Sequence, residues 1–193
     1  MFHLSSGAAV ESVIRANAQA GRVPVTVAQL AAMVRGEAPV PASPLFCLTF
    51  DDGYLVQYQQ ALPVLERYQV PATFYIIGTV WQGDGVHSYM NLDQVQDLYT
   101  RGHEIGSHTV DHRDLVPLRA RDVNAYWAEL VDSKAQLEAL IDADVTTFAY
   151  PDGSFTPAIL QDVAGIYKAA VSTVAGTLQS SSLEYALRRS RIS

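Results

Sequence analysis

The stretch Leu45–Gly53, which reads LFCLTFDDG, decides how this chain is expected to fold. Its mainly apolar run, Leu45–Phe50, follows a proline-rich linker and is typical of a fully buried strand. Two adjacent carboxylates come directly after the run, and like charges this close are unfavourable unless a cation or a hydrogen-bond donor separates them. The stretch therefore predicts a strand that ends in a polar site, although Asp-Asp-Gly taken alone is equally typical of a solvated turn.

Further apolar runs alternate with helical patterns along the chain. Helices are expected to begin after the N-caps Thr26 and Asn91, and the longest is expected over 118–141. Strands alternating with helices predict an α/β fold with a parallel sheet, as either an open doubly wound sheet or a closed barrel. In both, the site lies at the carboxyl ends of the strands. The other strands are expected at 23–25, 72–77, 103–107, 145–150, 167–174 and 187–192.

Composition and charge exclude several classes of protein. The chain has 193 residues, of which 49% are hydrophobic and 17% charged, as in one folded domain. Thirteen Lys and Arg against twenty Asp and Glu give a net charge of −7, which argues against a nucleic-acid partner. The one cationic cluster, Arg188, Arg189 and Arg191, is expected to be a solvated terminus. No apolar stretch is long enough to span a membrane, and Met1–Val10 does not resemble a secretory signal.

The single cysteine, Cys47, excludes an intrachain disulfide and a thiolate zinc site. It is expected to be a small buried hydrophobe.

A second polar segment, His108-Thr-Val-Asp-His112, follows the strand expected at 103–107. On a helical turn this spacing puts both imidazoles on one face, close enough to share a metal ion. Asp111 and Asp114 are candidates to orient the second ring nitrogens. Alone, the pair is also typical of surface histidines. With an aspartate from the first strand end it makes an Asp-His-His set with open positions, as in hydrolytic metal sites.

A third segment, Phe148–Gly153, ends the strand expected at 145–150 with Tyr-Pro-Asp-Gly. The backbone N–H groups after Pro151 are free to point into the site, where they could donate to a developing oxyanion. Alone, the segment is an ordinary connection from strand to helix.

In this order, the three segments resemble the polysaccharide deacetylases of carbohydrate esterase family four, the NodB-type deacetylases. The matching motifs are Thr-Phe-Asp-Asp-Gly at 49–53, His-Thr-x-x-His at 108–112 and Phe-Ala-Tyr-Pro-x-Gly at 148–153, the last as in the Phe-Ala-Tyr-Pro branch. The resemblance covers roughly residues 22–192. It implies an irregular (β/α) barrel with fewer than eight strands. We expect one domain over 1–193, with a helical lead-in at 1–44 and a catalytic core at 45–193.

The resemblance also implies a role for each matching residue. Asp52, His108 and His112 would hold a divalent metal, most often Zn²⁺, with Co²⁺, Ni²⁺, Fe²⁺ or Mn²⁺ as alternatives. Asp51 would be the general base that deprotonates the metal-bound water, and the backbone N–H of Asp152 would stabilise the oxyanion. The implied reaction removes N-acetyl groups from a polysaccharide that contains N-acetylglucosamine. Hydrolysis of another amide or imide, and glycan binding with little turnover, stay open.

Two departures from the family pattern concern the proton transfers. Ala149 stands where many members carry an arginine that orients the base. The stretch Leu187-Arg188-Arg189 stands where many members have Leu-x-His, whose histidine protonates the leaving amine. We expect His87 to be the candidate general acid, with water as the alternative, and His103 to be packed inside its strand.

Aromatic residues at strand ends are candidates to contact the sugar. The set comprises Tyr54, Trp81, Tyr89 and Tyr150, with Pro151 beside them. For Tyr54 and Trp81, packing in the core is equally expected, and Tyr126 and Trp127 on the long helix are expected in the core. The resemblance further implies an N-acetylated glycan as partner and a secreted or cell-envelope location.

Overall fold

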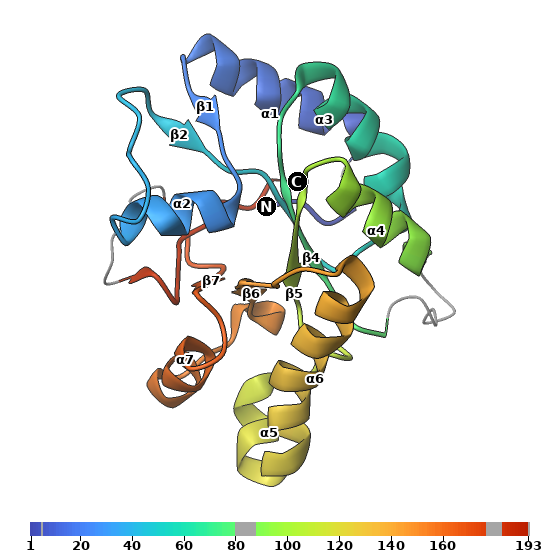
Figure 1. The fold of residues 1–193 in the computed structure, drawn as a ribbon, viewed down its shortest axis with the longest axis vertical. Coiled ribbons are helices and arrows are strands. Elements are labelled where there is room, and N and C mark those ends of the chain that lie inside the picture. Colours follow the sequence, from blue (N-terminus) through green and yellow to red (C-terminus); the bar gives the residue numbers. More distant parts are fainter. Residues whose placement is uncertain (5, 80–87, 177–182, 193) are drawn as a thin grey trace.

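The computed structural model describes residues 1–4, 6–79, 88–176 and 183–192. At its centre is a curled, five-stranded parallel sheet whose spatial order, β3-β4-β5-β6-β7, equals the order along the chain (Figure 1). All the carboxyl ends of these strands therefore lie along one edge of the sheet. The expected α/β fold with fewer than eight strands is confirmed. The strands are β3 (Thr49–Phe50), β4 (Thr73–Ile76), β5 (Glu104–Ser107), β6 (Thr147–Ala149) and β7 (Ala169–Val171).

Helices cover the sheet from several sides, and every residue of β4, β6 and β7 is buried. Because both faces of the sheet are covered, the strands are continuous apolar runs in the sequence and do not alternate between apolar and polar residues. In Figure 1 three helices gather at the top and right, and three others lie below the sheet. The first group is α1 (Gly7–Gln19), α3 (Leu62–Tyr68) and α4 (Leu92–Thr100), and the second is α5 (Leu115–Arg121), α6 (Val123–Ile141) and α7 (Pro157–Ala164).

The run expected as one strand at 45–50 is divided between two sheets. Its first part, β2 (Leu45–Phe46), pairs with β1 (Val23–Pro24) in a separate two-stranded sheet, and only β3 joins the main one. Cys47 lies at the change of sheet, half-buried, with its thiol donating to the carbonyl of Thr26 at 3.6 Å. Burial raises the pKa of this thiol to about 12, so Cys47 stays a neutral packing residue.

Both ends of the described chain add to the edges of the main sheet. Phe2 forms a parallel bridge with Phe50, and its buried ring stacks on that of Phe50 at 5.1 Å. Leu187 forms a single bridge with Val171, so the strand expected at 187–192 is reduced to one pair. The two termini lie side by side (Figure 1), since Ile192 N–H donates to the carbonyl of Met1 at 3.1 Å. Residues near both ends of the chain therefore lie next to the outer strands of the sheet and can reach the site at the carboxyl ends of the strands.

The long helix expected over 118–141 is two helices. Asp122, with an extended backbone at φ −149°, separates α5 from α6, and its carboxylate accepts the Ala125 N–H to cap α6. Tyr126 is buried as expected, whereas Trp127 is 39% exposed, so its assignment to the core was wrong. The caps at Thr26, which begins α2 (Val27–Val34), and at Asn91 are confirmed.

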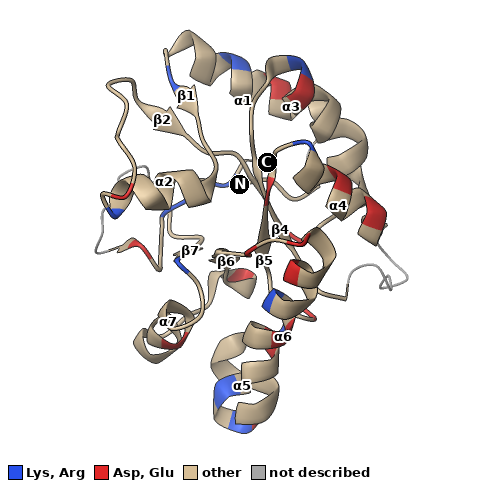
Figure 2. Cartoon of the chain, viewed as in Figure 1, with Lys and Arg blue, Asp and Glu red and all other residues tan. Residues whose placement is uncertain are grey.

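A short π-helix, η1 (Gln57–Ala61), precedes α3. Lys and Arg positions are scattered over several helices among acidic ones (Figure 2). Within the described ranges, no helix has the length and apolarity that crossing a bilayer requires.

Candidate metal centre

The turn after β3 carries the two adjacent carboxylates. Asp52 and Gly53 both adopt left-handed backbone conformations, with φ values of 76° and 82°. Asp51 and Asp52 are both buried, at 2% and 7% exposure. A solvated turn would leave these carboxylates in water, so the alternative reading of Asp-Asp-Gly is excluded.

Three side chains from two strand ends converge at this edge of the sheet. Asp52 Oδ1 lies 3.4 Å from His108 Nε2 and 3.6 Å from His112 Nε2, and the three ligand atoms all lie within 4.8 Å of one another. A tetrahedral ion with bonds of about 2.0–2.1 Å needs ligand atoms roughly 3.3–3.4 Å apart. The set therefore fits one divalent ion. These are the three residues expected from the sequence to come together, and their role as ligands stays a prediction.

His108 is held in the orientation that a metal ligand needs. Its ring is buried, and Nδ1 lies 2.8 Å from the carbonyl oxygen of Ala149 in β6. Because a carbonyl only accepts, Nδ1 carries a proton, and Nε2 is the nitrogen that faces Asp52 and that can bind an ion once its own proton has left. The expectation that Asp111 or Asp114 orients this ring was wrong. Asp114 instead accepts the Val116 N–H and caps α5.

The approach of His112 to His108 has a different cause from the one expected. The residues between them form a loop and not a helical turn. Thr109 and His112 both lie in the left-handed region, with φ values of 69° and 60°. The Thr109 hydroxyl oxygen accepts the His112 N–H at 3.0 Å. The two imidazoles meet edge to face, with centroids 4.7 Å apart.

Asp51, the carboxylate outside the ligand set, is paired with Arg189. The guanidinium donates from Nη1 to Oδ1 at 2.6 Å and from Nη2 to Oδ2 at 2.8 Å. Arg189 also donates to the Thr49 hydroxyl and the Ser172 carbonyl, and it lies 5.6 Å from the ring centre of Tyr75. Arg189 is 7% exposed, so its assignment to a solvated terminus was wrong.

Arg189 thus contacts Asp51 as a cation, which is the part that the family resemblance gives to an arginine at the position of Ala149. In the sequence, the signal for this contact is the Leu187-Arg188-Arg189 stretch, which puts a cation where the family resemblance leads us to expect a histidine.

Burial and charge set the ionisation of the site. Burial would raise the pKa of Asp51, but Arg189 and His108 outweigh it, so this pKa lies below its ordinary value. Burial likewise opposes ionisation of Asp52, and the hydrogen bond and charge of His108 reverse this and lower its pKa. Asp51 is therefore an ionised carboxylate at neutral pH, as a proton acceptor must be.

Burial also acts on the two imidazoles. It would lower the pKa of His108, but Asp52 and Asp51 raise it overall. For His112, burial and the charge of His108 lower the pKa.

One histidine of this site was missed by the sequence analysis. His3 Nε2 lies 4.0 Å from Asp51 Oδ2 and 3.9 Å from Asp52 Oδ2, with its side chain 29% exposed. The pairing of Phe2 with Phe50 carries it there, and no local pattern marks such a bridge. His87 lies outside the described residues, as does Trp81. His103 is packed as expected, with Nδ1 accepting the Ala72 N–H at 3.2 Å.

The third motif forms a short turn, η3 (Pro151–Gly153), beside the ligands. Tyr150 is 1% exposed, and its hydroxyl donates to the carbonyl of Tyr185 at 2.8 Å. It therefore presents no face for a sugar to stack on, contrary to what the sequence led us to expect. Pro151 is also buried. Asp152 is exposed, with a left-handed backbone at φ 56°.

Tyr54 and Tyr89, two further aromatic candidates, are both half-buried, and Tyr54 lies beside Asp52. Its ring stacks on that of Tyr89 at 5.0 Å.

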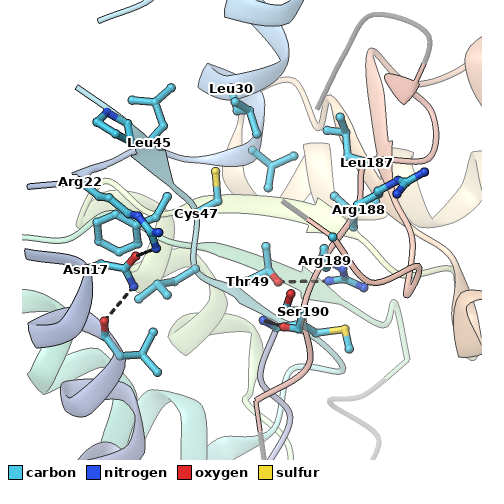
Figure 3. Close-up of a pocket in the computed structure, with 18 of the residues that line it drawn as sticks. Asn17, Arg22, Leu30, Leu45, Cys47, Thr49, Leu187, Arg188, Arg189 and Ser190 are labelled. Atoms are coloured by element: carbon cyan, nitrogen blue, oxygen red, sulfur yellow. Dashed lines mark hydrogen bonds between the residues drawn. The ribbon is translucent and has the colours of Figure 1, made fainter. Parts of the chain in front are cut away.

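A cavity of about 800 Å³ lies beside the sheet (Figure 3). Leu30, Leu45 and Leu187 form part of its wall, and the Cys47 sulfur points into it. Thr49 and Arg189 also line it, whereas none of the three ligands is among the described residues of its wall. The cavity is therefore separate from the three candidate ligands, and Arg189, which holds Asp51, belongs to both the cavity wall and the site.

The fold and the site together define an α/β protein in which an Asp-His-His group at the carboxyl ends of the strands could hold one metal ion. The family model for polysaccharide deacetylases matches residues 40–167. The chain belongs to this family.

Relatives and solved structures agree with this assignment. The chain is 31% identical over 154 residues to the polysaccharide deacetylase-related protein YxkH of Bacillus subtilis, covering 79% of this chain and 53% of YxkH. It is 32% identical over 130 residues to the chitooligosaccharide deacetylase of Sinorhizobium fredii, covering 67% and 56%. The chain thus spans about half the length of these curated relatives. The deacetylase PplD of Streptococcus pyogenes, solved with acetate, superposes with a TM-score of 0.86 at 25% identity, over 96% of this chain and 80% of PplD.

Proposed function

We propose that this chain is a metal-dependent deacetylase that hydrolyses the acetamide of N-acetylglucosamine units in a polysaccharide. One observation carries the proposal: a three-ligand set fit for one ion stands beside an ionised carboxylate that is not a ligand. The names of the relatives support the substrate class, and PplD was solved with acetate, the acid that this reaction releases. We also propose that residues 1–193 form one domain and that the protein acts outside the cell or in its envelope, where such polysaccharides lie.

The ion and the residues of the chain have separate tasks in this proposal. A divalent ion on Asp52, His108 and His112 supplies a Lewis acid that polarises the acetamide carbonyl and lowers the pKa of a water. We propose zinc, and the same ligands also accommodate Co²⁺, Ni²⁺, Fe²⁺ or Mn²⁺. Asp51 takes a proton from the attacking water. Because Arg189 grips both of its oxygens, the carboxylate is fixed while each oxygen keeps a lone pair for the proton.

The two remaining tasks are to stabilise the oxyanion and to protonate the leaving amine. We assign the first to the backbone N–H of Asp152, in the turn beside the ligands. We assign the second to His3, whose Nε2 lies within 4.0 Å of both carboxylates and whose side chain is part-exposed. His3 thus takes the place that the sequence analysis gave to His87. Tyr54 and Trp81 stay predicted sugar contacts.

The role of His3 is tested with two substrates. An activated ester such as p-nitrophenyl acetate has a leaving group that needs no proton, whereas the leaving amine of an acetamide does. His3→Gln is expected to lower the rate on the acetamide and to leave the rate on the ester near the wild-type value. Equal losses on both substrates would contradict the assignment, and a selective loss in His87→Gln would return the role to His87.

The proposed function is tested by acetate release from chito-oligosaccharides with added Zn²⁺, alongside the metal content of each protein. Asp51→Asn is expected to keep the ion and to lose about 10²–10⁴-fold in rate. Asp132→Asn, at an exposed position of α6, is the matched control and should change neither. A zinc-loaded chain that releases acetate from no acetylated amino sugar would refute the proposal. A panel of other amides and imides would then identify the reaction, and glycan binding with an unchanged rate in Asp51→Asn would indicate a binding domain.

A further inference from the structure

Glu129, on α6, is a buried carboxylate that the proposed reaction does not use. It is 3% exposed, and its Oε2 accepts two backbone N–H groups, from Val110 at 2.8 Å and from Asp111 at 3.1 Å. Burying a carboxylate costs free energy unless hydrogen bonds replace its lost water. Glu129 uses its acceptor capacity on the loop that joins the two histidine ligands.

That loop needs to be held because its backbone is strained. Thr109 and His112 are both in the left-handed region, which costs about 1–3 kcal/mol for each such residue and persists only where the surroundings enforce it. The carbonyl side of the loop is fixed from the end of β4, where Gly78 N–H donates to Thr109 O at 2.9 Å and Thr79 N–H to Val110 O at 2.8 Å. Glu129 fixes the amide side. The loop is therefore clamped between β4 and α6.

The two histidines depend on this clamp to different degrees. His108 follows β5 directly, is buried, and is anchored through Nδ1 to β6. His112 is itself the last strained residue of the loop, and its side chain is 31% exposed. A relaxation of the loop would therefore move His112 relative to the other two ligands.

We propose that Glu129 is a positioning residue for the metal centre: by holding the amides of Val110 and Asp111 it places His112 and thereby sets the affinity for the ion. The inference rests on the proposed function only in taking Asp52, His108 and His112 as the ligands. It requires an acceptor oxygen at this position and does not require a negative charge.

The experiment measures the affinity of the purified full chain for Zn²⁺ by competition with a chromophoric chelator. Glu129→Leu, which removes the acceptor, is expected to raise the Kd about 10–100-fold, the range found when groups that orient metal ligands are lost. Glu129→Gln keeps an oxygen that can accept both amides, so its Kd is expected to stay near the wild-type value. The visible spectrum of the Co²⁺-loaded proteins should change in the Leu variant and not in the Gln variant.

Glu138 provides a matched control on the same helix. Its Oε1 accepts the Val145 N–H at 3.0 Å and pairs with Lys134, away from the ligand loop. Glu138→Leu is expected to lower the melting temperature while leaving the Zn²⁺ Kd unchanged.

The outcomes separate this inference from the proposed function. If Glu129→Leu keeps the wild-type Kd, or if Glu138→Leu weakens zinc as much, Glu129 is only a structural residue and the inference is overturned. Glu129→Ala gives the same comparison if the Leu variant does not fold. A wild-type chain that binds zinc tightly but releases no acetate would refute the proposed function and leave the Kd comparison to decide on Glu129. A wild-type chain that takes up no zinc overturns both.

Discussion

Replacing Arg189 with methionine should damage both stability and turnover, because this side chain lies between the core and the base. Arg189 and Asp51 are almost entirely buried and share two hydrogen bonds, at 2.6 and 2.8 Å. Removing one member of such a pair leaves an unpaired buried charge and typically costs about 3–5 kcal/mol. In a chain of this length that lowers the melting temperature by roughly 6–20 °C.

The assay for stability is calorimetry of the metal-free proteins, so that ion binding does not contribute to the melting temperature. A double-mutant cycle with Asp51→Asn isolates the pair. Because the second substitution removes the stranded charge, the double variant should be less destabilised than the sum of the two single variants, by about 1–3 kcal/mol.

The same variant should lose turnover without losing metal. Arg189 contacts the base and none of the three ligands. A base displaced by about 1 Å costs on the order of 100-fold in rate. Arg189→Met is therefore expected to release acetate about 100-fold more slowly with its full complement of zinc. A variant that melts and turns over like the wild type would refute the reasoning that Arg189 holds the base.

Three further predictions concern other parts of the molecule. Burial raises the pKa of Glu104, so the folded state loses stability as pH rises above the unfolded value of 4.5, by up to about 1.4 kcal/mol per pH unit. In urea unfolding, the free energy of unfolding of Glu104→Gln relative to that of the wild type should therefore rise with pH, and a constant difference would contradict this. Asp122→Ala removes the cap of α6 and should cost about 1 kcal/mol without changing acetate release, so a rate change would contradict the separation of cap and site. Removing the ion with a chelator should destabilise the wild type by about 2.7 kcal/mol if free zinc had stood at 100 times its Kd, and the melting temperature should fall accordingly. Asp52→Ala should show no such fall, and an equal fall in this variant would place the ion elsewhere.

The grouping of Asp52, His108 and His112 could be predicted from the sequence because each of the two segments that carry them follows a strand. In a parallel sheet all the carboxyl ends share one edge, so the Asp-Asp-Gly and His-x-x-x-His segments meet whatever lies between them. The expectation that a helical turn brings His108 and His112 together was nevertheless wrong. A loop with two left-handed residues brings the rings together, and a sequence pattern does not reveal backbone strain of this kind.

The supporting residues could not be predicted, because their contacts are long-range. Arg189 stands 138 positions after the carboxylate it grips, and His3 reaches the site through the pairing of Phe2 with Phe50. Glu129 bonds to backbone amides, which any residue can offer. The contacts of His3 and Glu129 leave no local pattern. The stretch Leu187-Arg188-Arg189 carries the signal for Arg189, but it also has the composition of an ordinary polar terminus.

Periodicity also misplaced parts of the long helical region. The apolar spacing over 118–141 is consistent with one helix, but Asp122 is a stronger N-cap than interior residue and starts a second one. On the same helix Tyr126 is buried and Trp127 is 39% exposed. The apolar pattern does not show which of two neighbouring aromatic residues packs into the core, so it could not distinguish them.

The central claim is that one divalent ion is held by Asp52, His108 and His112, and X-ray absorption spectroscopy of the zinc-loaded chain tests it most directly. The account predicts a first shell of nitrogen and oxygen at about 2.0–2.2 Å that contains two imidazoles, and loses one of them in His112→Ala. A shell with no imidazole, or one that is unchanged in this variant, would contradict it.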